Sequence, residues 1–135
     1  MNNIKETKEP SNYRNELFSS IKKDVIKELI DFEYDFANIG TIFIIDVIEF
    51  ICKSDDYIEM LMNLEKNVYI PIAKKYNMNL KTFKSDIAKA TNKMHETRYL
   101  KYPNEEKSKK TAKTIINCIV NKIKCSKLSN QTINT

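Results

Sequence analysis

Residues 66–94 read KNVYIPIAKKYNMNLKTFKSDIAKATNKM and carry the signals of a short helix, a tight turn and a longer helix. Pro71 is tolerated in the first turn of a helix, because its missing N–H is not needed there. Asn77 favours a turn, since asparagine tolerates the left-handed backbone that ends helices. Asn79 can cap the second helix with its side-chain oxygen. The stretch therefore predicts two helices joined by a few residues.

The second of these helices has two distinct faces. Apolar residues recur along it at intervals of three and four, which places them on one side: Leu80, Phe83, Ile87, Ala90, Thr91 and Met94. The opposite side is mostly polar and carries Lys81, Lys84, Ser85, Ala88, Lys89 and Asn92. Such a pair of helices, at about residues 66–95, predicts a helix-turn-helix, whose second helix can lie in the major groove of DNA.

The chain before this motif predicts further helices. Residues 1–14 are polar, without periodicity, and we expect a flexible arm there; an amphipathic helix follows at about 15–31. Residues 41–53, TIFIIDVIEFICK, are apolar nearly all round but fall short of the about 20 residues that span a bilayer. Their β-branched content suits a strand equally well. No similar segment exists to pair with them, so we interpret them as a central buried helix. Asp55 or Asp56 can cap a short helix at about 56–64.

The last third of the chain predicts one more long helix. After Met94 the sequence becomes polar, and a helix with an isoleucine-rich face is expected at about 105–125, followed by a flexible tail at 126–135. The predicted fold class is all-α: an orthogonal bundle of five to six helices in a single domain at 15–125, containing the helix-turn-helix. We expect one core to hold Ile42, Ile45, Ile48, Phe83 and Ile87.

Charge divides the chain into two halves. Residues 1–65 carry 7 Lys and Arg against 14 Asp and Glu, whereas residues 66–135 carry 16 against 4, a balance of +12. Such asymmetry indicates a polyanionic partner for the basic half. A solvated, lysine-rich surface explains the charge equally well on its own. Its coincidence with the predicted helix-turn-helix favours nucleic acid.

Metal and acid–base chemistry find little support. His95 is the only histidine in the chain, and no G-x-G-x-x-G, P-loop or nucleophile-elbow motif occurs. Cys118 and Cys125 are seven residues apart on one helical face, a spacing that we interpret as core contacts rather than a zinc site. With Cys52 they make an odd count, typical of free thiols in a reducing cytoplasm. No signal-peptide pattern opens the chain. We therefore expect a cytoplasmic protein that is not an enzyme, with no cofactor, metal, membrane or small-molecule substrate.

A family resemblance supports the same interpretation. Residues 68–77, VYIPIAKKYN, followed by a helix with Phe83 and Ile87, resemble the C-terminal DNA-binding domain of the stage-zero sporulation response regulator A family. A looser similarity runs from about Ile21 to Met94, with a final helix at 107–124. The resemblance implies a helical DNA-binding fold and a protein that pairs on DNA without a stable dimer in solution. We therefore expect a monomer in solution, with itself or another regulator as a further partner. The apolar face of 112–123 could instead form a dimer seam. The receiver domain of that family has no counterpart in this chain.

The candidate DNA-binding residues lie at the end of the first motif helix and along the second: Lys74, Lys75, Lys81, Thr82, Lys84, Ser85, Ala88, Lys89 and Asn92. Where the resembled family places a glutamate and two arginines, this chain has Lys84, Ser85 and Ala88. Asp86 replaces a small apolar residue. Because lysine is a point charge rather than a planar fork, the set favours contacts to phosphate over recognition of guanine.

Two functions from different classes follow. We expect a stand-alone, sporulation-regulator-like transcription factor that binds double-stranded DNA through its helix-turn-helix. The alternative is a protein-interaction module that retains the fold and modulates a sporulation regulator or the transcription machinery without reading DNA. Loss of the family's arginines favours the alternative, whereas the +12 half favours DNA.

Overall fold

The computed structural model describes residues 9–104 and 110–134, and every regular element in these ranges is helical. The predicted all-α class is confirmed. In chain order the elements are α1 (Glu9–Asp31), α2 (Ile39–Cys52), α3 (Tyr57–Met62), the π-helix η3 (Glu65–Tyr69), α4 (Ile70–Lys75), α5 (Leu80–Lys101) and α6 (Ala112–Asn134).

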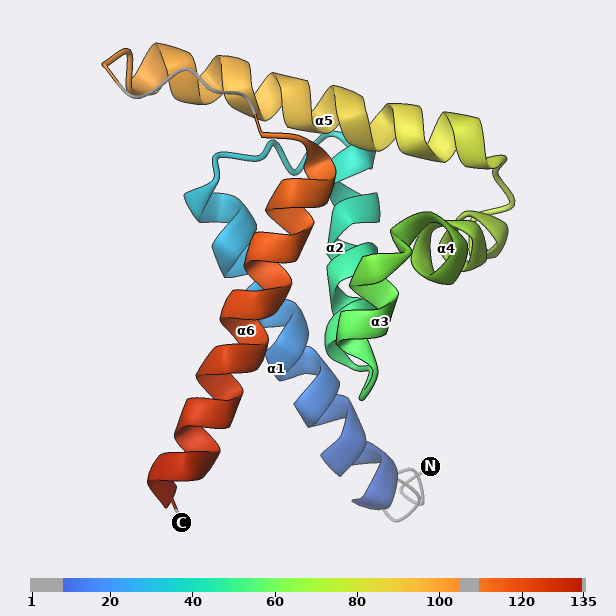
Figure 1. Ribbon diagram of the computed structural model, residues 1–135, viewed down its shortest axis with the longest axis vertical. Coiled ribbons are helices and arrows are strands. Elements are labelled where there is room, and N and C mark those ends of the chain that lie inside the picture. Colours follow the sequence, from blue (N-terminus) through green and yellow to red (C-terminus); the bar gives the residue numbers. More distant parts are fainter. Residues whose placement is uncertain (1–8, 105–109, 135) are drawn as a thin grey trace, which may run out of the picture.

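Helix α2 is the centre of the fold. It packs against α1, α3, η3, α5 and α6, while α5 lies across the end of the bundle where α2 begins (Figure 1). The prediction of a central buried helix at 41–53 is confirmed, because most of the α2 side chains are buried. Ile45 and Ile48 lie in the same core as Phe83 and Ile87, as expected.

The prediction that Ile42 belongs to this core is wrong. Its side chain is 37% exposed. Ile42 lies one turn before Asp46 and two turns before Glu49, and the two carboxyl side chains are only partly buried. These three residues share the one stripe of α2 that faces solvent, since positions four and seven apart lie on the same side of a helix.

Gly40 determines how closely α2 and α5 approach each other. A Cβ atom at this position would lie 2.0 Å from the carbonyl oxygen of Asp86 and 2.8 Å from the Cβ of Ala90. The only glycine of the chain therefore stands where the backbones of two helices meet. This contact fixes the position of α5 against the centre of the fold.

The two terminal helices differ from their predicted bounds. Helix α1 begins at Glu9, so residues 9–14 are helical rather than part of an arm; Pro10 is compatible with this because it occupies the first turn. Helix α6 begins at Ala112, after the Thr111 side chain accepts a hydrogen bond from the N–H of Thr114 (3.3 Å). It continues to Asn134 through most of the expected tail, since no glycine or proline interrupts it. Residues 1–8, 105–109 and 135 of the predicted segments lie outside the described residues.

The shorter helices connect α2 to α5. Helix α3 ends at Met62, two residues earlier than predicted, and the N-cap Asp56 makes no side-chain capping bond. The π-helix η3 immediately precedes α4, whose second residue is Pro71. Helix α5 continues past Met94 to Lys101, longer than predicted. It ends just before Tyr102, the residue that precedes Pro103, because a following proline disfavours the helical backbone.

Candidate nucleic-acid interface

The turn between α4 and α5 is built as its sequence predicts. Asn77 has a φ of 57°, in the left-handed region, and the N–H of Met78 donates to the carbonyl of Ala73 at 2.9 Å. The side chain of Asn79 accepts a hydrogen bond from the N–H of Thr82 at 2.8 Å. Both expected roles, the turn at Asn77 and the cap at Asn79, are confirmed. The first turn of α5 is therefore fixed by local hydrogen bonds.

Aromatic side chains hold the inner face of α5 against the core. The ring of Phe83 stacks on Phe43, with centroids 4.8 Å apart, and meets the edge of Tyr69 at 5.7 Å. About two turns further along, the hydroxyls of Tyr34 and Thr91 share a buried hydrogen bond of 2.9 Å. Burial raises the pKa of Tyr34 to about 12. These contacts leave only the opposite face of α5 free to meet a partner.

All nine candidate DNA-binding residues are exposed. On α5, Lys81, Ser85 and Ala88 form a stripe with Asn92, because positions separated by four, seven and eleven residues lie on one side of a helix. Lys84 flanks the stripe on one side, and Thr82 and Lys89 flank it on the other. The structure thus brings the α5 candidates together on one continuous surface. The remaining candidates, Lys74 and Lys75, form the last turn of α4.

Two of the five candidate lysines are already engaged with carboxylates. The ammonium group of Lys84 donates to Glu65 at 2.6 Å. Lys75 lies 3.8 Å from Asp46, which also accepts a hydrogen bond from the hydroxyl of Tyr76. Burial, and to a smaller extent the hydrogen bond to Asp46, raises the pKa of Tyr76 to about 12.

The other three candidate lysines have no such partner. Lys74, Lys81 and Lys89 make no ion pair within residues 20–104 and 110–126, so their charges face solvent. Their ammonium groups are the ones positioned to meet phosphates without breaking an existing contact. The candidate surface is therefore less positive than its lysine count suggests.

Sequence reasoning missed Glu65 and Asp46 as parts of this surface. Asp46 gave a signal, because it is one of only two acidic residues in an otherwise apolar helix. Glu65 gave none, since its contact with Lys84 joins residues 19 apart on different elements. Long-range ion pairs of this kind depend on the fold and leave no local pattern.

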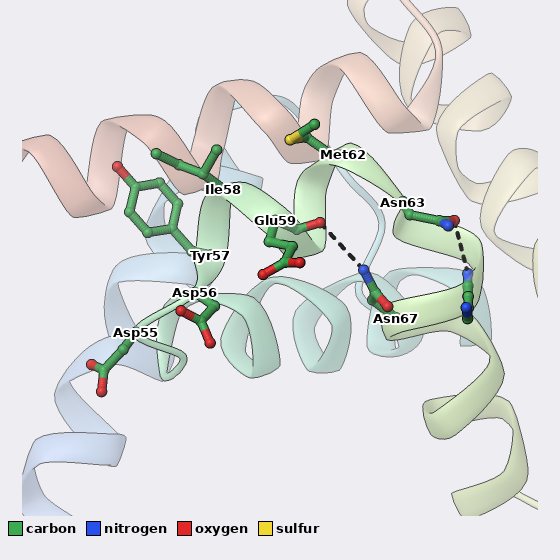
Figure 2. Close-up of a pocket in the computed structure, with 9 residues that line it drawn as sticks. Asp55, Asp56, Tyr57, Ile58, Glu59, Met62, Asn63 and Asn67 are labelled. Carbon is green, nitrogen blue, oxygen red and sulfur yellow. Dashed lines mark hydrogen bonds between the residues drawn. The ribbon is translucent and has the colours of Figure 1, made fainter.

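A second feature, an open hollow of about 740 Å³, lies beside α3. Figure 2 shows its side chains along α3 and the adjacent segments, with the Asn67 amide donating to the Glu59 carbonyl at 3.3 Å. Its acidic lining residues are Asp55, Asp56 and Glu59. These carboxylates would repel phosphate, so the hollow does not extend the candidate DNA surface.

Cysteine and histidine positions suggest no further chemistry. Cys118 and Cys125 are exposed, so the expected core contacts are wrong. The buried face of α6 is formed by Ile115, Ile116, Ile119, Val120 and Ile123. The Nε2 atom of His95 lies 2.8 Å from the carbonyl oxygen of Lys110. Across the described ranges, no group of three or more His, Cys, Asp or Glu side chains gathers where it could hold a metal ion. None of the helices in those ranges has the length and apolar character needed to span a bilayer.

The fold and surface together define an all-helical protein with an exposed, lysine-bearing helix positioned by a short turn. Comparisons with protein families, with curated proteins and with solved structures found no match to this chain.

Proposed function

We propose that this protein binds double-stranded DNA through the outer face of α5 and the end of α4, and acts as a transcription regulator. The observation that carries the proposal is the exposure of all nine candidate residues around a helix whose first turn is fixed by Asn77 and Asn79. Helix α5 has 22 residues and is thus about 33 Å long, so its first half alone can cross a major groove. Its regulatory role rests on the family resemblance.

Contacts to phosphate supply most of the proposed affinity. Lys74 on α4 and Lys81 and Lys89 on α5 act as point charges toward the DNA backbone. Ser85 and Asn92, which lie on the same stripe of α5 as Lys81, are short polar side chains that can hydrogen-bond base edges. With few such groups, the protein is expected to bind many duplex sequences with modest preference.

Fluorescence anisotropy with a labelled duplex of mixed sequence tests the proposal. At about 0.1 M salt each phosphate contact contributes roughly an eightfold increase in affinity, from the counterion slope of −0.9 per contact. Lys81→Ala/Lys89→Ala should therefore weaken binding by roughly 60-fold. The matched control is Lys22→Ala/Lys27→Ala, which removes two exposed lysines from α1 and should bind nearly as the parent does. Equal losses in both double variants would contradict a specific surface.

A second candidate function is the protein-interaction module. The observation that favours it is the exposure of Ile58 (60%) and Met62 (77%) on α3, at the hollow described above. The two side chains are four residues apart and so adjoin on the helix, and contiguous exposed apolar surface is typical of sites that meet other proteins. Absence of duplex binding by the parent at about 50 mM salt, where phosphate contacts are strong, would make this the better account.

A further inference from the structure

Glu65 and Lys84 link the π-helix η3 to the candidate DNA-binding face. Glu65 is the first residue of η3, and its carboxylate lies 2.6 Å from the ammonium group of Lys84 on α5. Both side chains are about half exposed, at 51% and 48%. The pair therefore lies at the surface, at the flank of the stripe that would face DNA.

The other paired lysine of the candidate set is held differently. Asp46 is only 16% exposed and is also the acceptor for the Tyr76 hydroxyl, so it holds the turn after α4 in place. The Glu65 carboxylate has Lys84 as its one side-chain partner among the described residues. An exposed pair of this kind contributes little to stability, because water screens it. Its effect on a polyanion is larger, since a phosphate must compete with the carboxylate for the same ammonium group.

We propose that Glu65 limits the affinity of this protein for DNA by withholding Lys84 from the phosphate backbone. The inference rests on the proposed function of the α4–α5 surface and identifies the residue that sets its strength. To reach a phosphate, Lys84 must leave Glu65, and the carboxylate then faces the DNA without a counterion. Loss of one phosphate contact and added repulsion both weaken binding to every duplex sequence.

A double-mutant cycle tests the inference with the same labelled duplex. Glu65→Gln should release Lys84, raise affinity by roughly eightfold at about 0.1 M salt and make the salt slope more negative by about 0.9. Lys84→Ala alone should weaken binding less than Lys81→Ala does, because Lys84 is already occupied in the parent and only repulsion by Glu65 is added. In the Lys84→Ala background, Glu65→Gln relieves only that repulsion and should raise affinity less than it does in the parent; the difference is the coupling that such a cycle measures.

Control variants separate this role from a general effect of charge and from a structural role. Glu96→Gln removes a carboxylate from the exposed face of α5. Glu96 makes no ion pair within the described residues. It should not reproduce the change in slope. The melting temperature of Glu65→Gln should match that of the parent, because an exposed pair adds little to stability.

Three outcomes would overturn the inference while leaving the proposed function intact. The first is a parent that binds DNA and a Glu65→Gln variant that binds it equally well. The others are an equal gain in affinity from Glu65→Gln with and without Lys84, or a loss of affinity from Lys84→Ala as large as that from Lys81→Ala. Failure of the parent and Glu65→Gln alike to bind the duplex would overturn both proposals together.

Discussion

Replacing Gly40 with alanine tests the packing that positions the candidate DNA-binding helix. The added Cβ would lie 2.0 Å from the Asp86 carbonyl oxygen, 2.7 Å from its carbonyl carbon and 2.8 Å from the Ala90 Cβ. Carbon atoms in proteins pack best at about 3.5–4.0 Å, so α2 and α5 would have to separate by roughly 1 Å or more. Overpacking of a core costs about 1–3 kcal/mol, occasionally more. We expect the upper end of that range, because two of the three obstructing atoms belong to backbone.

Helix propensity alone predicts that Gly40→Ala increases the stability of the protein. Alanine is about 1 kcal/mol more favourable than glycine within a helix. Urea denaturation followed by circular dichroism measures the free energy of unfolding and distinguishes the two. The Gly40→Ala/Ala90→Gly double variant is a useful companion: it removes the contact with the Ala90 methyl group but leaves the carbonyl of Asp86 in place. It should remain at least as unstable as Gly40→Ala. A Gly40→Ala protein as stable as the parent, or more so, would refute the close approach.

Three further predictions concern the core. Ile45→Ala should leave a cavity in the core around α2 and cost about 2–5 kcal/mol, and an unchanged melting temperature would show that α2 is not central. Thr91→Val removes the partner of the buried Tyr34 hydroxyl and should cost about 1–3 kcal/mol of stability. Adding Tyr34→Phe should recover much of that loss, because no polar group is then left unpaired. A double variant less stable than Thr91→Val would contradict this. Burial raises the pKa of Tyr34 and Tyr69 to about 12, and because their ordinary value is about 10, the unfolded chain loses these protons first. The contribution of these two tyrosines to the free energy of unfolding should thus be fully present below about pH 10 and be lost as the pH rises towards about 12. Constant urea midpoints across that interval would exclude the effect.

Local signals in the sequence were sufficient for much of the fold. The apolar run at 41–53 indicated the central helix, and Asn77 and Asn79 indicated the turn, because each acts through its own backbone neighbourhood. The polar face of the helix after Asn79 indicated which side of α5 faces solvent. Periodicity records burial well where one face is clearly apolar.

Other features depend on partners distant in the sequence. Ile42 was misplaced because α2 is apolar on nearly every side, so only Asp46 and Glu49 show which stripe faces solvent. The ion pair between Glu65 and Lys84 could not be predicted, since it joins two elements that only the tertiary fold brings together. This pair changes the expected behaviour of the candidate site more than any feature that the sequence displays.

The salt dependence of binding tests the central claim most directly. Five exposed lysines would give a log–log slope of about −4.5 against salt concentration, whereas the three unpaired ones, Lys74, Lys81 and Lys89, give about −2.7. Affinity for one mixed-sequence duplex should be measured by anisotropy from about 50 to about 200 mM salt, the range in which counterion release is pronounced. We predict a slope of about −2.7 for the parent and about −0.9 for Lys81→Ala/Lys89→Ala. A slope near zero for the parent, or the same slope for both proteins, would contradict DNA binding by this surface.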